Sequence, residues 1–419
     1  MPIDIFGKEN QLMNGSNSFF PKNNSVNNDR ESEQSIDMLP LRPTIISAVN
    51  LLLCSLLVPF MLSGNEMLTY GLSLVVCLLS AVVVFNSSKH IFLSIFYTIA
   101  LGLFIGSVTL PLLPALIFCP VVAIGSCAAL VCSGKGFLNL AVPLLAIGSF
   151  AIPLIVFGDP ILSLSALIIY LPVFALGFAS RKGATASGTV IACTASVVAV
   201  LIGFLCFTVY DLYGTLSIDT INQAINDFAA QTVIYTEQGM ELFTDIEVNE
   251  ALHNEILSIV DGYINLGFGM IVAVCTVYSF IAFKIQNGML AVHGITKYCD
   301  EQAGKITCSV ITSFLFIIAL ILSFSLDPHG NTSIVSVIAD NICLILTPIL
   351  VLMAFEAIRT LPSRLGLIGL ILSAAIVLLI IVGVFFTFPM IVPLSGAVYV
   401  IAIRVDAWAK EHYSKGENQ

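Results

Sequence analysis

A single acidic residue stands inside an apolar stretch of the chain, where an ionised side chain could do chemistry. Asp340 is followed directly by Asn341 and, eight residues later, by Pro348. If this stretch crosses a bilayer, an acid inside it is costly and usually faces the bundle interior or a water-filled cavity. We therefore interpret Asp340, Asn341 and Pro348 as a candidate substrate or ion pathway. Two structural alternatives stay open: a hydrogen bond to a neighbouring helix, or a span shifted so that Asp340 nears the outer interface.

Other polar residues in the apolar stretches predict local contacts. Glu356 and Arg359 are three residues apart, which favours an ion pair on one helix face. Asn50 in the first apolar stretch is typical of a hydrogen bond between helices. His253 has acidic neighbours but no second histidine nearby, so it makes a poor metal site.

The sequence lacks the local signatures of common catalytic sites. It has no P-loop, no G-x-S-x-G, no H-E-x-x-H and no C-x-x-C. Most of its 11 cysteines lie in apolar runs, which indicates small apolar filler in a helix bundle. We predict no catalytic residue, no metal site and no cofactor, and hence no enzyme.

The composition decides the class of protein. Hydrophobic residues make up 58% of the chain and charged residues 10%, and the mean hydropathy is +1.01. Soluble domains carry about 25% charged residues, so this chain cannot cover a soluble surface. The net charge of −10 argues against nucleic acid as a partner, because such binding needs a basic face. The lipid bilayer is the predicted partner.

The apolar runs are long enough for membrane spans, which need roughly 20 residues each. We predict an all-α, polytopic transmembrane helix bundle of about 12 spans (11–12), with a helical extracytoplasmic loop. The count around residues 108–132 and 386–404 is the least certain part. The predicted spans are 44–63, 67–85, 90–108, 110–132, 137–157, 161–179, 186–210, 263–283, 306–325, 333–355, 366–386 and 389–404.

The distribution of basic residues predicts the orientation. With the N-terminus inside and twelve spans, all 16 Lys and Arg residues fall on one side of the membrane. The other side carries the ten acidic residues of one long loop, and no basic residue occurs between Lys182 and Lys284. Because basic residues are retained in the cytoplasm, both termini are predicted to be cytoplasmic.

The long loop predicts two helices of its own. Ser217 and Asp219 can cap a first helix whose apolar side is Ile218, Ile221, Ile225 and Phe228. A second helix begins at the capping-box pattern of residues 244–247 and continues towards the eighth span. We expect both to lie over the outer face of the bundle, where the acidic loop could bind a protein partner.

These observations divide the chain into five segments. The first 40 residues are polar, rich in Asn and Ser, and contain no apolar region of a signal peptide. The predicted segments are a disordered cytoplasmic tail (1–41), N-terminal transmembrane helices (42–210), the acidic extracytoplasmic helical loop (211–262), C-terminal transmembrane helices (263–405) and a cytoplasmic tail (406–419).

Part of the chain, roughly residues 90–405, resembles a known family. The stretch Leu176-Gly-Phe-Ala-Ser-Arg-Lys-Gly183, the acidic helical loop, Asp340-Asn341 with Pro348, and the final Gly396-Ala-Val-Tyr-Val-Ile-Ala-Ile-Arg404 are similar to the YybS-like family of uncharacterised bacterial polytopic membrane proteins. The acid expected within the last helix of that family is missing here. The family is distantly similar to the substrate-binding membrane subunits of energy-coupling-factor vitamin importers, so the resemblance implies small-molecule handling.

The function expected from the sequence is that of a transporter-like or transport-associated protein of a bacterial plasma membrane, acting on a small molecule. The alternative is a membrane assembly or scaffold protein that docks a partner through the outer loop. A third class, enzymes of lipid-linked sugars, needs basic residues outside to hold pyrophosphate, and this outer face has none.

Overall fold

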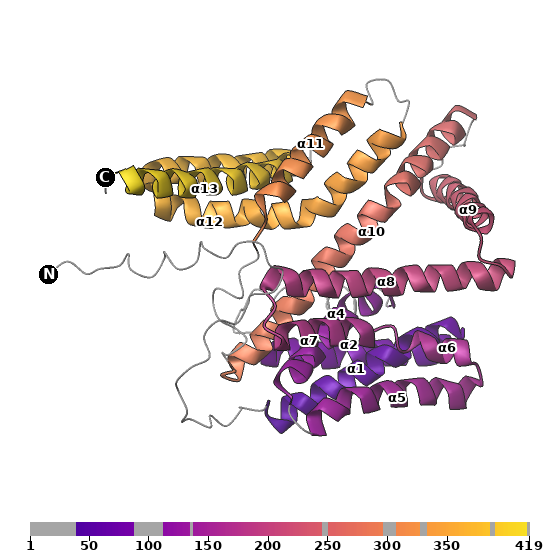
Figure 1. Ribbon diagram of the computed structural model, residues 1–419. Coiled ribbons are helices and arrows are strands. Elements are labelled where there is room, and N and C mark those ends of the chain that lie inside the picture. The colour runs from indigo at the N-terminus through magenta and orange to yellow at the C-terminus, as the bar shows by residue number, and fades with distance from the viewer. Residues whose placement is uncertain are drawn as a thin grey trace, which may run out of the picture. The chain divides into compact units, whose positions relative to one another are not determined.

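Helices are the regular elements of the part of the chain that the structure describes. The computed structural model describes residues 39–87, 112–134, 137–244, 250–295, 307–326, 333–385 and 390–416, and every regular element in these ranges is a helix (Figure 1). Within them, eight helices are long and apolar enough to cross a membrane. In lipid, a helix satisfies all of its backbone hydrogen bonds internally. The all-α prediction is confirmed for these residues, and the helices indicate a membrane-embedded protein.

The helices follow the predicted spans closely. Eleven of the twelve predicted spans coincide with an apolar helix, and the remaining one, 90–108, lies outside the described residues. Three of the eleven are shorter apolar helices: Phe118–Ser133, Val310–Ser325 and Gly366–Leu378.

The chain forms two compact units. The first comprises Met1–Cys193 and Ile281–Lys305, and the second comprises Thr194–Phe280 and Ile306–Gln419. Two helices, α8 (Ala186–Tyr213) and α10 (Glu250–Val292), run from one unit into the other. The described complete helices of the first unit, which pack side by side in Figure 1, are α1 (Leu41–Leu62), α2 (Glu66–Ser87), α4 (Leu112–Ser133), α5 (Phe137–Phe157), α6 (Pro160–Ser165) and α7 (Tyr170–Arg181).

Buried hydroxyl groups connect the helices of the first unit. The Ser55 hydroxyl of α1 donates to the Leu52 carbonyl (2.7 Å) and accepts from Ser149 of α5 (2.7 Å). Ser149 in turn accepts from the Tyr170 hydroxyl of α7 (2.6 Å). All three hydroxyl-bearing residues are buried, so the chain of hydrogen bonds ties three helices together where water cannot compete.

The sixth predicted span is two helices in the structure. Asp159 caps α6 by accepting from the Ile161 amide (2.8 Å), with Pro160 in the first turn. A turn over residues 166–169, held by hydrogen bonds between residues three apart, separates α6 from α7. Pro172 follows in the first turn of α7, where its missing amide is tolerated.

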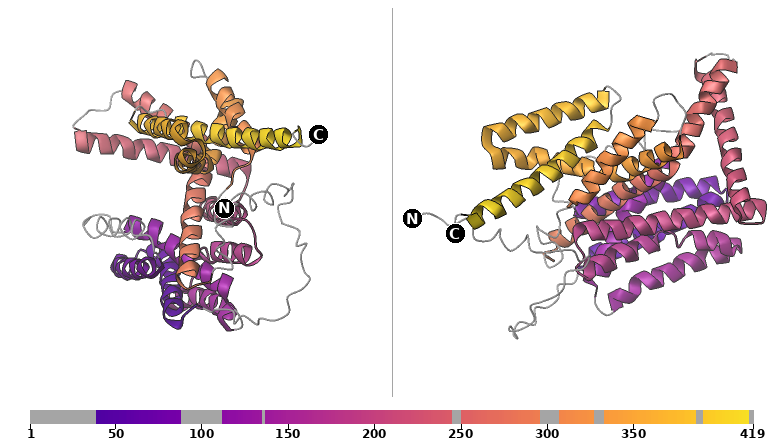
Figure 2. Two further views of the ribbon diagram at one scale, coloured as in Figure 1. Left: turned by 90° about the vertical axis from the view of Figure 1, so that its left-hand side faces the viewer. Right: turned by 45° about the horizontal axis from the view of Figure 1, so that its top comes forward.

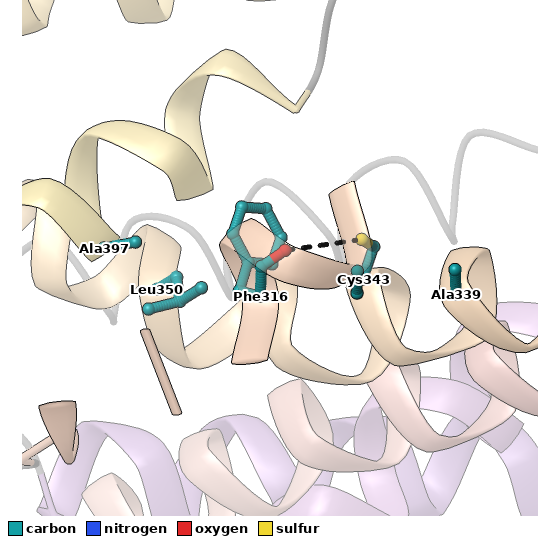
Figure 3. Close-up of a cluster of buried hydrophobic side chains, with 6 residues drawn as sticks. Phe316, Ala339, Cys343, Leu350 and Ala397 are labelled. Atoms are coloured by element: carbon teal, nitrogen blue, oxygen red, sulfur yellow. Dashed lines mark hydrogen bonds between the residues drawn. The ribbon is translucent and has the colours of Figure 1, made fainter. Parts of the chain in front are cut away.

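The second unit contains the helices of the acidic segment and the C-terminal helices. Its complete described helices are α9 (Ile218–Thr244), α11 (Val310–Leu326), α12 (Ile334–Phe385) and α13 (Ile391–Gly416). The long α12 is two helices joined at Gly366, whose φ of 57° and ψ of −126° suit glycine alone. One buried cluster joins α11, α12 and α13 through Phe316, Cys343, Leu350 and Ala397 (Figure 3).

Several predicted boundaries need correction. The first loop helix begins as expected, because the Thr220 amide donates to the Ser217 hydroxyl (3.2 Å). However, α9 continues to Thr244, so this residue ends the first loop helix and does not cap the second. The second loop helix is the beginning of α10, which runs on into the eighth span as predicted. The C-terminal segment 406–419 is helical as far as Gly416, because α13 continues beyond the predicted span.

Candidate substrate or ion site around Asp340

Asp340 lies in the second turn of α12 and faces α11. Its side chain accepts a hydrogen bond from the hydroxyl of Ser323, one element earlier in the chain. The residue is half-buried, and the described residues place no basic group within ion-pair distance of it. The partner of this acid is therefore a neutral hydroxyl, which can hydrogen-bond either the ionised or the protonated carboxyl.

Asn341, the next residue, faces α10 and uses all of its hydrogen-bonding groups there and in its own helix. Its side-chain nitrogen donates to the carbonyls of Asn265 and Val337 (both 2.8 Å). Its side-chain oxygen accepts from the Gly269 amide (2.6 Å). Asn265 and Gly269 are four residues apart, so their carbonyl and amide are the pair that an α-helix joins to each other. The Asn341 side-chain amide thus hydrogen-bonds both the carbonyl and the amide of one i, i+4 backbone pair of α10.

This contact requires a very small residue on α10. A Cβ atom at Gly269 would lie 2.8 Å from the Asn341 side-chain oxygen and 3.0 Å from the Asn341 Cα. By contrast, a Cβ at Gly267, two residues earlier, would meet nothing within 4 Å. Small residues at helix contacts let backbones approach closely, as is common between membrane helices. Gly269 is therefore a part of the site that sequence reasoning missed.

Pro348 does not break α12. The backbone stays helical through it, and the one non-helical residue within α12 is Gly366. Two residues after Pro348, the Leu350 carbonyl lies against α13, where a Cβ at Gly396 would be only 1.9 Å from the Leu350 oxygen. The neighbourhood of Pro348 is thus a close helix contact, and the sequence signal for it was Gly396 at the start of the last predicted motif.

The three predicted site residues divide into two groups. Asp340 and Asn341 are adjacent residues that contact different helices, α11 and α10. The same turn of α12 is therefore linked to both helices. Pro348 lies two helical turns further along, beside the α12–α13 contact. The polar part of the candidate site therefore consists of Asp340, Ser323 and the Asn341 amide.

Two further predictions concern single side chains. His253 of α10 pairs with Glu237 of α9 through its Nδ1 atom (2.5 Å), so it links these two helices. The ion pair predicted between Glu356 and Arg359 is not formed: Glu356 is half-buried, Arg359 is exposed, and no ion-pair contact joins them. An exposed arginine gains little by such a pair, because water competes for it.

The predicted role of Asn50 is confirmed. The Ser80 hydroxyl of α2 donates to its side-chain oxygen (3.1 Å), which links α1 and α2. The Asn50 side-chain nitrogen is buried and has no hydrogen-bond partner among the described residues, and the same holds for the Ser47 hydroxyl one turn earlier. The cysteine prediction is also supported, because most of the described cysteines are buried in helices.

Within the described residues, no group of three or more His, Cys, Asp or Glu side chains could hold a metal ion. Comparisons of the chain with models of protein families, with curated proteins and with solved structures give no match.

Proposed function

We propose that the chain is a multi-pass protein of a bacterial plasma membrane with a transporter-like or transport-associated role for a small molecule. The observation that carries the proposal is the half-buried carboxyl of Asp340, which lies in an apolar helix and has a neutral partner. Ionisable residues in such helices are costly, and they commonly mark substrate, ion or proton pathways. The resemblance to the YybS-like family is a part of the same proposal.

The proposed topology has twelve spans with both termini in the cytoplasm. It is supported by the basic residues, which fall on one side only if an even number of spans separates Lys89 from Lys135. The helix α4 supplies one crossing between them, and residues 90–108 are proposed as the other. The acidic α9 and the beginning of α10 are then extracytoplasmic.

Labelling of single engineered cysteines tests this topology. Gln238→Cys places a thiol on an exposed position of α9, and Ser363→Cys places one on an exposed position at the opposite end of the bundle. A membrane-impermeant maleimide should label Gln238→Cys in intact cells and Ser363→Cys only in broken cells. The chain with its natural cysteines alone gives the background. The reverse pattern, or labelling of both in intact cells, contradicts the topology.

The role of Asp340 is tested by separating its charge from its hydrogen bond. Asp340→Asn removes the charge but keeps an oxygen that can accept from Ser323. Ser323→Ala keeps the carboxyl but removes the donor. If the charge serves a ligand or ion, native mass spectrometry of the gently purified full-length chain should show a retained small molecule that Asp340→Asn loses and Ser323→Ala keeps.

The structural alternative predicts a different pattern. If the carboxyl serves only to hold α11 against α12, Ser323→Ala should lower the folded yield, and Asp340→Asn should behave like the wild type in both yield and retained mass. That result would reject the pathway role. Equal yields for all three proteins make the retained mass a clean measure of binding.

A second candidate function is membrane assembly or scaffolding. It is favoured by a specific observation on the outer loop: Ile218, Phe228 and Tyr235 of α9 are 78%, 64% and 71% exposed. Large apolar side chains gathered on one exposed helix face are typical of interaction sites. This face is the subject of the next subsection.

A further inference from the structure

Most of the large exposed apolar residues of α9 follow a regular spacing; Ile234, which is 51% exposed, lies outside it. Steps of three and four residues alternate along Ile218, Ile221, Ile225, Phe228, Thr232 and Tyr235. This is the spacing of the a and d positions of a coiled coil, sustained here for about two and a half heptads. We call these six residues the α9 seam. Five of the six are apolar, and those five are exposed.

The contact between α9 and α10 uses a face of α9 other than the seam. Val233 of α9 is buried against Ile256 and Val260 of α10, with Ala229 and Met240 beside it. The two helices lie alongside each other (Figures 1 and 2). The contact to α10 therefore uses residues next to the seam, and the seam itself stays uncovered among the described residues.

The residues that flank the seam carry no charge. The e and g positions of its heptads, which face a partner helix across a coiled coil, are Asn222, Ala224, Ala229, Gln231, Thr236 and Gln238. The acidic residues of this part of α9 lie elsewhere: Asp219, Asp227 and Glu237 occupy the b, c and f positions. An acidic helix with acidic flanks would repel its own copy, and this arrangement avoids that repulsion.

The same charges argue against other occupants. Amphipathic helices that lie on a membrane surface are rich in Lys and Arg on their polar face, but α9 contains neither. A basic partner protein would be held by acidic residues beside the seam, and those positions are neutral. A second copy of the same helix matches both the apolar seam and its uncharged flanks.

We propose that α9 is a self-association surface, through which two copies of this chain pair along the α9 seam. A free helix of this length would pair weakly in water. Here α9 is already folded against α10, and both copies are confined to one membrane, which raises their effective concentration. Phe228 and Tyr235 are of the aromatic types that are enriched at the centre of protein interfaces. The inference goes beyond the proposed transport role and does not depend on it.

Cross-linking of the full-length chain in isolated membranes tests the proposal. Phe228→Cys places a thiol near the middle of the seam, where two copies meet in either a parallel or an antiparallel pair. Ala230→Cys is the matched control, because it is exposed on the same helix at an f position. With a short bifunctional maleimide, Phe228→Cys should give a product of twice the chain mass, and Ala230→Cys and the unaltered chain should not.

Each other outcome overturns the proposal. Equal cross-linking at both positions indicates random collisions, and no product at either position indicates that the seam is not paired with a copy. A product at Phe228→Cys whose mass is that of this chain plus a different protein identifies another partner. The topology proposal is tested separately, because labelling of Gln238→Cys does not require a dimer.

A charge-insertion pair gives an independent measurement. Ile225→Glu with Phe228→Glu puts two carboxylates on the seam, and Gln223→Glu with Ala230→Glu puts the same charges on exposed f positions. We expect the first pair to weaken the dimer at least about tenfold in native mass spectrometry of the purified chain, because partnerless carboxylates oppose burial. The second pair should leave the dimer intact. All four positions are exposed in the described structure, so neither variant disturbs a packed core. Equal effects of the two pairs contradict the seam.

Discussion

Two asparagines, one in each unit, show two ways to use an amide inside an apolar helix. Asn50 of the first unit is fully buried, its side-chain oxygen accepts from the Ser80 hydroxyl and weakly from the Cys54 thiol of its own helix, and its side-chain nitrogen has no partner among the described residues. Asn341 of the second unit is half-buried, and it makes three hydrogen bonds, two of them to the backbone of α10. The buried amide is thus the less satisfied one.

The two asparagines also differ in the contacts around them. Near Asn50 the helices of the first unit are joined through side chains, such as the Ser55–Ser149–Tyr170 chain of hydrogen bonds. Direct backbone contacts occur in both units: a Cβ at Gly125 of the first would lie 2.5 Å from the Ala282 carbonyl oxygen, and a Cβ at Gly396 of the second would lie 1.9 Å from the Leu350 carbonyl oxygen. Direct backbone contacts are less tolerant of added volume, so we expect the closer contact, at Gly396, to respond more strongly to a single small change.

The largest effect is expected from Gly396→Ala. The added Cβ would lie 1.9 Å from the Leu350 carbonyl oxygen and 3.0 Å from the Ala354 amide nitrogen, and both are backbone atoms that cannot move aside. Overpacking of this kind costs roughly 3 kcal/mol. The midpoint of thermal unfolding in detergent should fall accordingly, although alanine favours a helix by about 1 kcal/mol over glycine.

Gly267→Ala is the matched control for Gly396→Ala. It is also a helical glycine of the second unit, and its Cβ would meet nothing within 4 Å. The helix preference for alanine then acts alone, so the midpoint should stay equal or rise. A similar loss in both variants would show that the backbone contact at Gly396 is not the cause.

Asn341→Ala is expected to have a smaller effect than Gly396→Ala, and Asn50→Ala a smaller effect than Asn341→Ala. Interhelical hydrogen bonds in membrane proteins contribute about 0.6 kcal/mol each on average, and at most about 1.7 kcal/mol. Loss of the two bonds to α10 should therefore destabilise the chain by roughly 1–2 kcal/mol. Loss of the one interhelical bond at Asn50 should cost roughly half as much, because that change also removes a buried nitrogen that has no partner among the described residues. Unfolding midpoints of both variants, measured side by side, test the order, and a larger loss at Asn50 would reverse the comparison.

These residues also show what the sequence could and could not predict. The helices followed from apolar run length, and the cap at Ser217 and the Asn50 hydrogen bond followed from local spacing. Which helix Asn341 would meet depended on packing between residues 72 to 76 positions apart, which no local pattern encodes. Which face of α9 would be buried could not be predicted for a related reason: the contact with α10 is what buries Val233.

The position of Asp340 along the membrane normal could not be predicted from the sequence, for another reason. The span that contains it, Ile334–Ser363, has 30 residues, whereas a crossing needs roughly 20. Apolar length alone therefore allows several positions of the helix along the membrane normal. The contact with Ser323 is what places the carboxyl at the α11–α12 interface.

A still smaller effect separates the tyrosines of the two units. The Tyr170 hydroxyl donates to Ser149, which donates to Ser55 and so reaches the Leu52 carbonyl. The Tyr399 chain is one link shorter, because Tyr399 donates to Thr360 and Thr360 donates directly to the Glu356 carbonyl. Hydrogen bonds in a chain polarise one another, so Tyr170→Phe should destabilise by about 1 kcal/mol and Tyr399→Phe by less. Equal unfolding midpoints for the two variants would show that the longer chain of hydrogen bonds at Tyr170 contributes no additional stability.

The smallest expected effect is a dependence of stability on pH at the end of α10. His293 follows the last residue of this helix, in the first unit, and its Nε2 atom is buried without a hydrogen-bond partner among the described residues. Burial lowers the pKa of His293 below its ordinary value of 6.5, because the charged form loses water. The folded chain then binds this proton less readily than the unfolded chain does. The stability that comes from keeping His293 neutral is therefore fully present above its ordinary pKa. It is lost as the pH falls through the lower pKa of the folded state.

The comparison of His293→Gln with the wild type isolates this contribution. Glutamine does not titrate, so the fall in unfolding midpoint between about pH 7.5 and about pH 5.5 should be smaller in His293→Gln than in the wild type. His253→Gln is the control, because His253 is paired with Glu237 of α9 and is more exposed than the Nε2 atom of His293. If both variants flatten the pH profile equally, the buried Nε2 atom is not the source. If His293→Gln leaves the pH profile unchanged, the folded first unit tolerates a charged His293. Buried polar atoms without a partner, such as the Asn50 nitrogen, would then cost less in this unit than the comparison with Asn341 suggests.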